Sequence, residues 1–137
     1  MDDILKKYPN DVKVVIKNFP LSFHKQARRA AQYSLAAHRQ GKFKEMYHGI
    51  FDEYRKLKTN EDLPLEIAER LGLDMEKFKR DANDPEIDAQ IQKEFDQMRN
   101  SGIPRLSVPK FLVAGKEPQG RDFATFSAMI DEALKKK

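Results

Sequence analysis

Two short strand-like segments lie far apart in this chain and are separated by a long helical stretch. Residues 12–18, VKVVIKN, are rich in β-branched residues, and residues 109–114, PKFLVA, form a second apolar run that ends before Gly115. Residues from about His24 to Asn100 have helical patterns throughout. Strands joined through long helical connections predict an α/β fold in which helices cover a sheet.

The helical stretch has recognisable starts and inner faces. Asp74 and Asp84 are predicted N-caps, because an Asp side chain accepts a hydrogen bond from the first turn of a helix. The clearest amphipathic helix covers residues 42–57 and repeats apolar residues at helical spacing: Phe43, Met46, Tyr47, Ile50, Phe51, Tyr54 and Leu57. Its aromatic stripe could form a ligand slot, but the regular spacing favours core packing.

After Gly102 the residue pattern is no longer helical. We expect a turn through GKEPQG, residues 115–120, and a closing helix that Asp122 caps. The inner stripe predicted for that helix is Phe123, Phe126, Ile130, Ala133 and Leu134.

Pro109 is the first residue of the second predicted strand, a position where a residue without a backbone N–H is tolerated. A plain trans proline at a strand start is one interpretation. A cis Val108–Pro109 bond is the other, although only about 5–6% of such bonds in folded proteins are cis.

Composition restricts the function further. The chain has 137 residues, which suits one domain, and its net charge of +4 is a small excess of 26 basic over 22 acidic residues. We therefore expect no nucleic-acid partner. No apolar run reaches the length of a membrane span, the first residues do not form a signal peptide, and the spacing of His24, His38 and His48 predicts no metal site.

Three stretches together resemble the DsbA-like branch of the thioredoxin fold, which comprises exported bacterial thiol–disulfide oxidoreductases. YPNDVKVVIKNFPLSFH, residues 8–24, resembles that family's second strand and the turn after it. Residues 27–54 resemble its Ala-rich and aromatic helices. SGIPRLSVPKFLVAGKEPQGRDFATFSAMIDEAL, residues 101–134, resembles its cis-proline strand, hairpin and last helix.

The resemblance implies a single domain over residues 1–137, with a helical insertion at about 23–101 between strand 12–18 and the cis-proline strand 109–114. It also implies a cis bond before Pro109 and a backbone at Val108 that pairs with an extended substrate peptide. Ser107 and His24 would contribute to the same docking groove. For His24, a polar residue near a helix N-terminus is the simpler interpretation.

The departure from the family is the absence of cysteine. The family's Cys-x-x-Cys follows its first strand, and this chain begins at a segment that resembles the end of the helix carrying that motif. We therefore expect a domain that lacks the first, central strand and is inactive in disulfide exchange, because no thiolate is present. The unpaired strand edges predict a homodimer, a swapped oligomer or a collapse of strand 12–18 onto strand 109–114.

Three functions follow from these observations. The first is a DsbA-like oxidoreductase domain of the bacterial periplasm or cell envelope, whose cysteine pair is missing here and whose substrates are extended or unfolded polypeptides. The second is a non-catalytic thioredoxin-like module that binds peptides or a partner. The third is a glutathione-dependent isomerase or transferase of the same superfamily. None of them implies a bound metal or cofactor. Coding DNA upstream of codon 1 that contains an in-frame Cys-x-x-Cys would favour the first.

Overall fold

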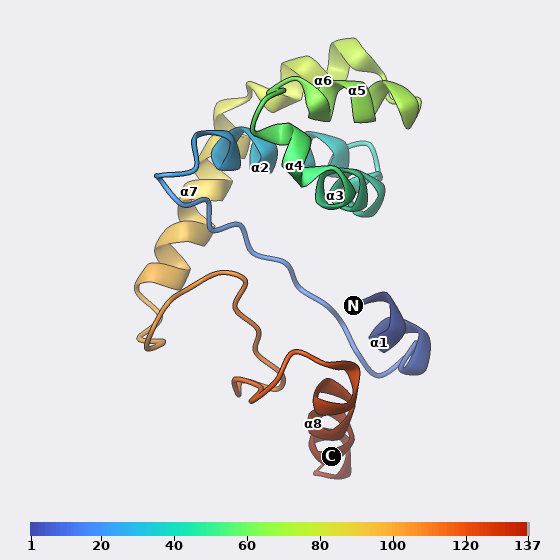
Figure 1. Cartoon of the computed structure of the whole chain (residues 1–137), viewed down its shortest axis with the longest axis vertical. Helices are drawn as coiled ribbons and strands as arrows, with labels where there is room; N and C mark the ends of the chain where they lie inside the picture. The colour runs from blue at the N-terminus through green and yellow to red at the C-terminus, as the bar shows by residue number, and fades with distance from the viewer. Residues whose placement is uncertain (137) are drawn as a thin grey trace. The chain divides into compact units, whose positions relative to one another are not determined.

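The chain forms two compact units, seen in a computed structural model that describes residues 1–136. The smaller unit combines both ends of the chain, Met1–Ile16 and Pro104–Lys137, and the larger unit is Lys17–Ile103 (Figure 1). The predicted helical insertion at about 23–101 lies inside the larger unit.

The larger unit is built from helices around α2. These are α2 (Lys25–His38), α3 (Phe43–Asp52), α4 (Tyr54–Leu57), α5 (Leu63–Arg70), α6 (Met75–Ala82) and α7 (Pro85–Arg99). Helix α2 contacts α3, α5, α6 and α7. The small residues Ala36 and Ala37 are fully buried there, so these helices approach the backbone of α2 closely.

The predicted helix starts of this unit are confirmed. Asp74 accepts a hydrogen bond from the backbone N–H of Lys77, and Asp84 accepts one from Glu86. Pro85 occupies the first turn of α7, where the missing N–H costs no intrahelical bond. The core that these helices bury includes Met46, Leu63, Phe78, Ile87 and Ile91.

The predicted single helix over residues 42–57 is wrong. It breaks after Asp52 into α3 and α4, and the aromatic stripe is not core, because Phe51 is 61% and Tyr54 53% exposed. The face that packs inward is centred on Met46 and Gly49 instead. A Cβ atom at Gly49 would lie 2.8 Å from Cγ2 of Ile67, so α3 lies tightly against α5 on that side.

The smaller unit contains α1 (Asp2–Lys7), α8 (Phe123–Lys135) and two extended segments, residues 12–16 and 104–112. Ile4, Tyr8, Phe126 and Ile130 form its buried cluster, and Val12, Phe111, Val113 and Leu134 pack against it. Asp122 caps α8 as predicted, by accepting from the N–H of Thr125. Phe123 does not join the inner stripe and is 47% exposed at the start of the helix.

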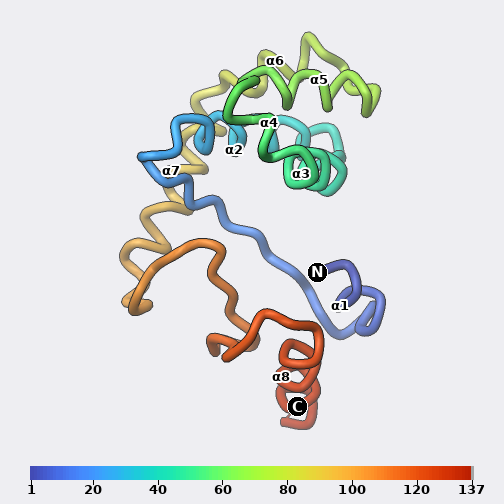
Figure 2. The backbone as a smooth tube through the Cα atoms, viewed as in Figure 1, coloured from blue at the N-terminus to red at the C-terminus, as the bar shows by residue number. Residues whose placement is uncertain are grey.

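The predicted strands 12–18 and 109–114 are not formed within residues 1–136. Figure 2 shows residues 12–17 as an extended trace that belongs to no helix. The backbone N–H groups of residues 12–17 have no hydrogen-bond partner in the described chain. A β-strand is defined by a ladder of backbone hydrogen bonds to a neighbouring strand, and these residues form none. The β-sheet of the expected α/β fold is therefore absent from residues 1–136, which are largely helical.

One isolated antiparallel bridge joins Val113 to Lys116 across a tight turn. The central residues Ala114 and Gly115 both have positive φ, 48° and 81°, which is typical of a type I′ hairpin turn. The turn thus begins two residues before the predicted GKEPQG segment and overlaps it only at Gly115 and Lys116.

Candidate functional site

Ser107, Val108 and Pro109 lie together on an exposed stretch of the smaller unit. The side chains of all three are exposed, and Val108 is 42% exposed despite being apolar. The Val108–Pro109 peptide bond is cis, the conformation that the family resemblance implies.

The backbone of this stretch is unpaired. From Arg105 to Leu112, no backbone N–H donates a hydrogen bond to any group within residues 1–136. Such a row of free N–H and C=O groups is a template for pairing with another extended chain.

Contacts on both sides hold the stretch in place. Phe111 packs edge-on against Phe126 of α8, with ring centroids 5.4 Å apart. The Nζ atom of Lys110 lies 2.6 Å from a carboxylate oxygen of Glu117, and it also donates to the carbonyl of Pro104 at 3.4 Å. The Val113–Lys116 turn follows immediately, so the stretch is anchored at its C-terminal end.

Helix α8, which Phe111 contacts, packs in turn against α1. The Tyr8 hydroxyl donates to Oδ1 of Asp131 at 2.6 Å, and the Nζ atom of Lys7 lies 3.7 Å from the other carboxylate oxygen. The Tyr8 hydrogen bond is the main reason that the pKa of Asp131 is lowered. The two ends of the chain are therefore tied together by a charged hydrogen bond next to the apolar cluster.

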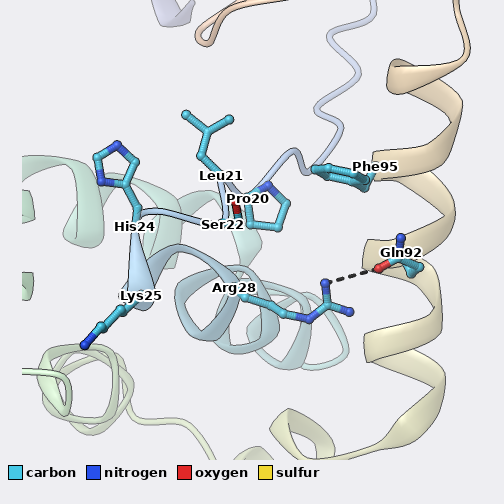
Figure 3. A pocket seen from close by; sticks show the side chains of 8 residues that line it. All are labelled: Pro20, Leu21, Ser22, His24, Lys25, Arg28, Gln92 and Phe95. Atoms are coloured by element: carbon cyan, nitrogen blue, oxygen red, sulfur yellow. Dashed lines mark hydrogen bonds between the residues drawn. The ribbon is translucent and has the colours of Figure 1, made fainter.

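His24 belongs to the larger unit and lines a shallow groove at the start of α2 (Figure 3). Pro20, Leu21 and Phe95 supply its apolar wall, and Arg28 donates to Gln92 at 3.4 Å. His24 precedes α2 without a side-chain capping hydrogen bond, and its ring lies 4.6 Å from that of Phe23. The structure thus places His24 and the Ser107–Pro109 stretch in different compact units.

The groove is closed at one side by ion pairs between α2 and α7. Nε of Arg28 donates to Oδ1 of Asp88 at 2.9 Å, and this bond lowers the pKa of the Asp88 carboxyl. Arg39 pairs with both Asp81 and Asp84 at the opposite end of α2. These contacts bind the helices together and pair the charges of Arg28 and Arg39.

The other two histidines, His38 and His48, lie in helices of the larger unit. His38 ends α2 and its ring meets Phe43 edge-on at 6.1 Å, while His48 lies beside Tyr47 on α3. No group of three His, Asp or Glu side chains within residues 1–136 could hold a metal ion. In the same residues, no helix is both long and apolar enough to cross a membrane.

Charge segregation along the chain is a feature that the sequence analysis missed. Residues 12–44 contain eight Lys and Arg residues and no Asp or Glu. Residues 97–116 contain four Lys and Arg residues and no Asp or Glu. Counting charges by segment rather than over the whole chain would have found it. The acid-free stretches include both extended segments of the smaller unit.

Comparison with known proteins gives one family and two partial relatives. A family model described as "DSBA-like thioredoxin domain" matches residues 1–128. The chain is 28% identical over 131 residues to a protein of Herminiimonas arsenicoxydans named Na(+)/H(+) antiporter NhaA, covering 95% of this chain and 20% of that protein. It is 35% identical over 82 residues to Na(+)/H(+) antiporter NhaA 1 of Mycolicibacterium vanbaalenii, covering 59% of this chain and 13% of that protein. No solved structure matches the chain significantly.

Proposed function

The chain belongs to the DSBA-like thioredoxin domain family, and from this membership we propose that it is a peptide-docking domain of the disulfide-exchange type without dithiol chemistry of its own. Thiol–disulfide exchange requires a thiolate to attack a disulfide sulfur, and the chain contains no cysteine. Binding of an extended polypeptide is the part of the family's function that its residues can still perform.

The observation that carries this proposal is the free backbone of residues 105–112. A peptide in extended conformation could exchange N–H···O=C hydrogen bonds with this stretch, as in other cases of strand addition. Val108 and Leu112 remain partly exposed beside that backbone, so they could contact the peptide's side chains. The docking residues are therefore Ser107, Val108 and Pro109. For His24, which lies in the other unit, a role in docking stays a prediction.

The alternative is a domain that acts in disulfide exchange together with cysteines from elsewhere in a longer polypeptide. The chain spans about a fifth or less of the antiporters it resembles, so their transport activity is not proposed for it. The periplasm or cell envelope is the compartment that both forms of the proposal imply.

Two measurements on the pure chain test the proposal. Insulin reduction should show no turnover above the uncatalysed rate. Titration with an extended synthetic peptide, followed by nuclear magnetic resonance, should shift the amide signals of residues 105–112. The same peptide carrying N-methyl groups at alternate positions has lost the N–H donors that strand pairing needs. Its affinity should therefore be lower by a factor of about ten or more.

Val108→Ala provides the control on the side chain. Because the backbone would carry the pairing, this variant should bind the peptide within about threefold of the original chain. Equal binding of the N-methylated and unmethylated peptides would contradict backbone docking. Turnover of insulin by the pure chain would contradict the redox-inactive assignment.

A further inference from the structure

We propose that the smaller unit, with its free backbone at residues 105–112, selects extended peptides in which acidic side chains alternate with apolar ones. This inference rests on the proposed function and names the class of peptide. It follows from the charges and the exposed apolar groups of the two extended segments of the smaller unit, residues 12–16 and 104–112, and of the turn 113–116 that follows the second.

These two segments and the turn carry cations and no acids. Residue 13 is a lysine, and residues 105, 110 and 116 are arginine or lysine, whereas Asp11 and Glu117 lie just outside the segments. An approaching peptide with acidic side chains would be attracted to those cations of the segments that have no acidic partner. A basic peptide would be repelled, because like charges on neighbouring strands are unfavourable.

Most of these cations are available to a ligand. Lys110 is not, because it is paired with Glu117 and its side chain is only 7% exposed. Lys13, Arg105 and Lys116 have no salt bridge or side-chain hydrogen bond to any group within residues 1–136. The acid whose pKa Lys116 helps to lower, Glu132, is already hydrogen bonded to Lys136 at 2.9 Å.

Apolar side chains accompany the free cations. Val15 is 65% exposed and Ile16 45% exposed in the first segment, and Leu112 is 48% exposed in the second. An extended peptide places successive side chains on opposite faces. In the segment 12–16, Lys13 and Ile16 lie on opposite faces, so a paired peptide that alternates acidic and apolar residues can place its acids beside Lys13 and its apolar residues beside Ile16.

A second copy of this chain is a poorer occupant of the same segments. Self-pairing would bring Lys13 or Arg105 of one copy near the same cations of the other, with no acid in either segment to compensate. Charge complementarity therefore favours an acidic partner strand over a homodimer.

The test compares three synthetic peptides of equal length that alternate valine with glutamate, glutamine or lysine. Binding is measured by fluorescence anisotropy at low salt and at about 0.5 M salt, where screening weakens interactions between exposed charges. The glutamate peptide should bind about tenfold more tightly than the glutamine peptide at low salt and lose most of this advantage at high salt. The lysine peptide should bind most weakly.

The double variant Arg105→Gln/Lys116→Gln should reduce the preference for glutamate about fivefold and leave the glutamine peptide unaffected. Lys79→Gln/Arg80→Gln on α6 is the matched control, since it removes two exposed charges from the larger unit and should change nothing. Circular dichroism confirms that each variant keeps its helices.

The outcomes separate this inference from the proposed function. Equal binding of all three peptides overturns the acidic preference and leaves peptide docking intact. Absence of binding by any peptide overturns both. Concentration-dependent dimerisation that is abolished by Val15→Glu, without peptide binding, assigns the segments to a second copy and overturns the inference.

Discussion

The two compact units of the chain satisfy their backbone and apolar groups to different extents. In the larger unit, helices supply the backbone partners, and residues such as Phe78 and Ile91 are fully buried. In the smaller unit, two extended segments have free N–H groups, and only a small cluster around Tyr8 and Phe126 is buried. Large apolar side chains exposed in the smaller unit are Met1, Val15, Ile16, Val108, Leu112 and Phe123.

The difference shows that the same polypeptide combines a helical core with a region whose backbone groups have few hydrogen-bond partners within residues 1–136. Helices satisfy their backbone within one segment, whereas an extended segment needs a neighbouring one. The docking function is proposed for the unit in which that neighbour is missing from the described residues.

Hydrogen exchange should give the largest contrast between the units. Amides of residues 105–112 should exchange at nearly unprotected rates, because nothing in the described chain accepts their protons. The amides of Ala36 and Ala37 in α2 should be slower by about 10³-fold or more, since they open only when the larger unit unfolds. Mass spectrometry of exchanged fragments measures this, and similar protection in both places would refute the comparison.

A matched pair of phenylalanine truncations should give the largest difference in stability. Phe78→Ala should lower the free energy of unfolding by about 3–5 kcal/mol, because Phe78 is fully buried and stacks on Tyr33. Phe123→Ala should change it by no more than about 0.5 kcal/mol, because that side chain is half exposed. Urea unfolding followed by far-ultraviolet circular dichroism measures both. Equal effects would contradict the assignment of the main core to the larger unit.

Acidification should weaken the larger unit through the carboxylates that face α2. Hydrogen bonds from Lys77 and then Arg39 lower the pKa of Asp81, and the bond from Arg39 lowers that of Asp84. A folded pKa below the unfolded value means that the unfolded chain binds protons first. The stabilisation is therefore complete above about pH 4–5 and is lost as the pH falls through the folded values.

Urea midpoints measured from pH 7 to pH 3 test this expectation. Arg39→Gln should flatten the decline, since part of the lowering disappears with the guanidinium. Arg80→Gln, on the exposed face of α6, is the control and should keep the original slope. A slope that Arg39→Gln leaves unchanged would show that other carboxylates account for the acid sensitivity.

The hairpin turn of the smaller unit should give the smallest effect, in the stabilising direction. Ala114 has a φ of 48°, which is unfavourable for a residue with a Cβ atom. Ala114→Asn creates the Asn-Gly pair that a type I′ turn prefers and should raise the free energy of unfolding by about 0.5–1 kcal/mol. Ala114→Val should lower it. Thermal unfolding of both variants checks the sign, and a stabilising valine would contradict the turn type.

The helices were predictable because their signals are local. Asp74, Asp84 and Asp122 cap the helices that they were predicted to cap, since capping depends on residues only two or three positions apart. The aromatic stripe of α3 was misassigned because spacing alone does not reveal which face of a helix is packed. Close contact of Gly49 with Ile67 sets that face, and such contact between distant residues has no local signal.

The strands were predicted from composition but need partners that composition does not supply. Residues 12–17 have the β-branched character of a strand and remain extended, yet they form no ladder within residues 1–136. For the candidate site, the family resemblance indicated Ser107–Pro109, while the free backbone and the unpaired cations around it required the structure.

The smaller unit is assembled from the two ends of the chain, with all of residues 17–103 between them. Bringing the ends of a long flexible loop together has an entropic cost that grows with its length. Prior folding of the intervening helices replaces that loop by a compact body and shortens the effective search. We therefore expect α1 and α8 to meet late in folding, after the helical region has formed.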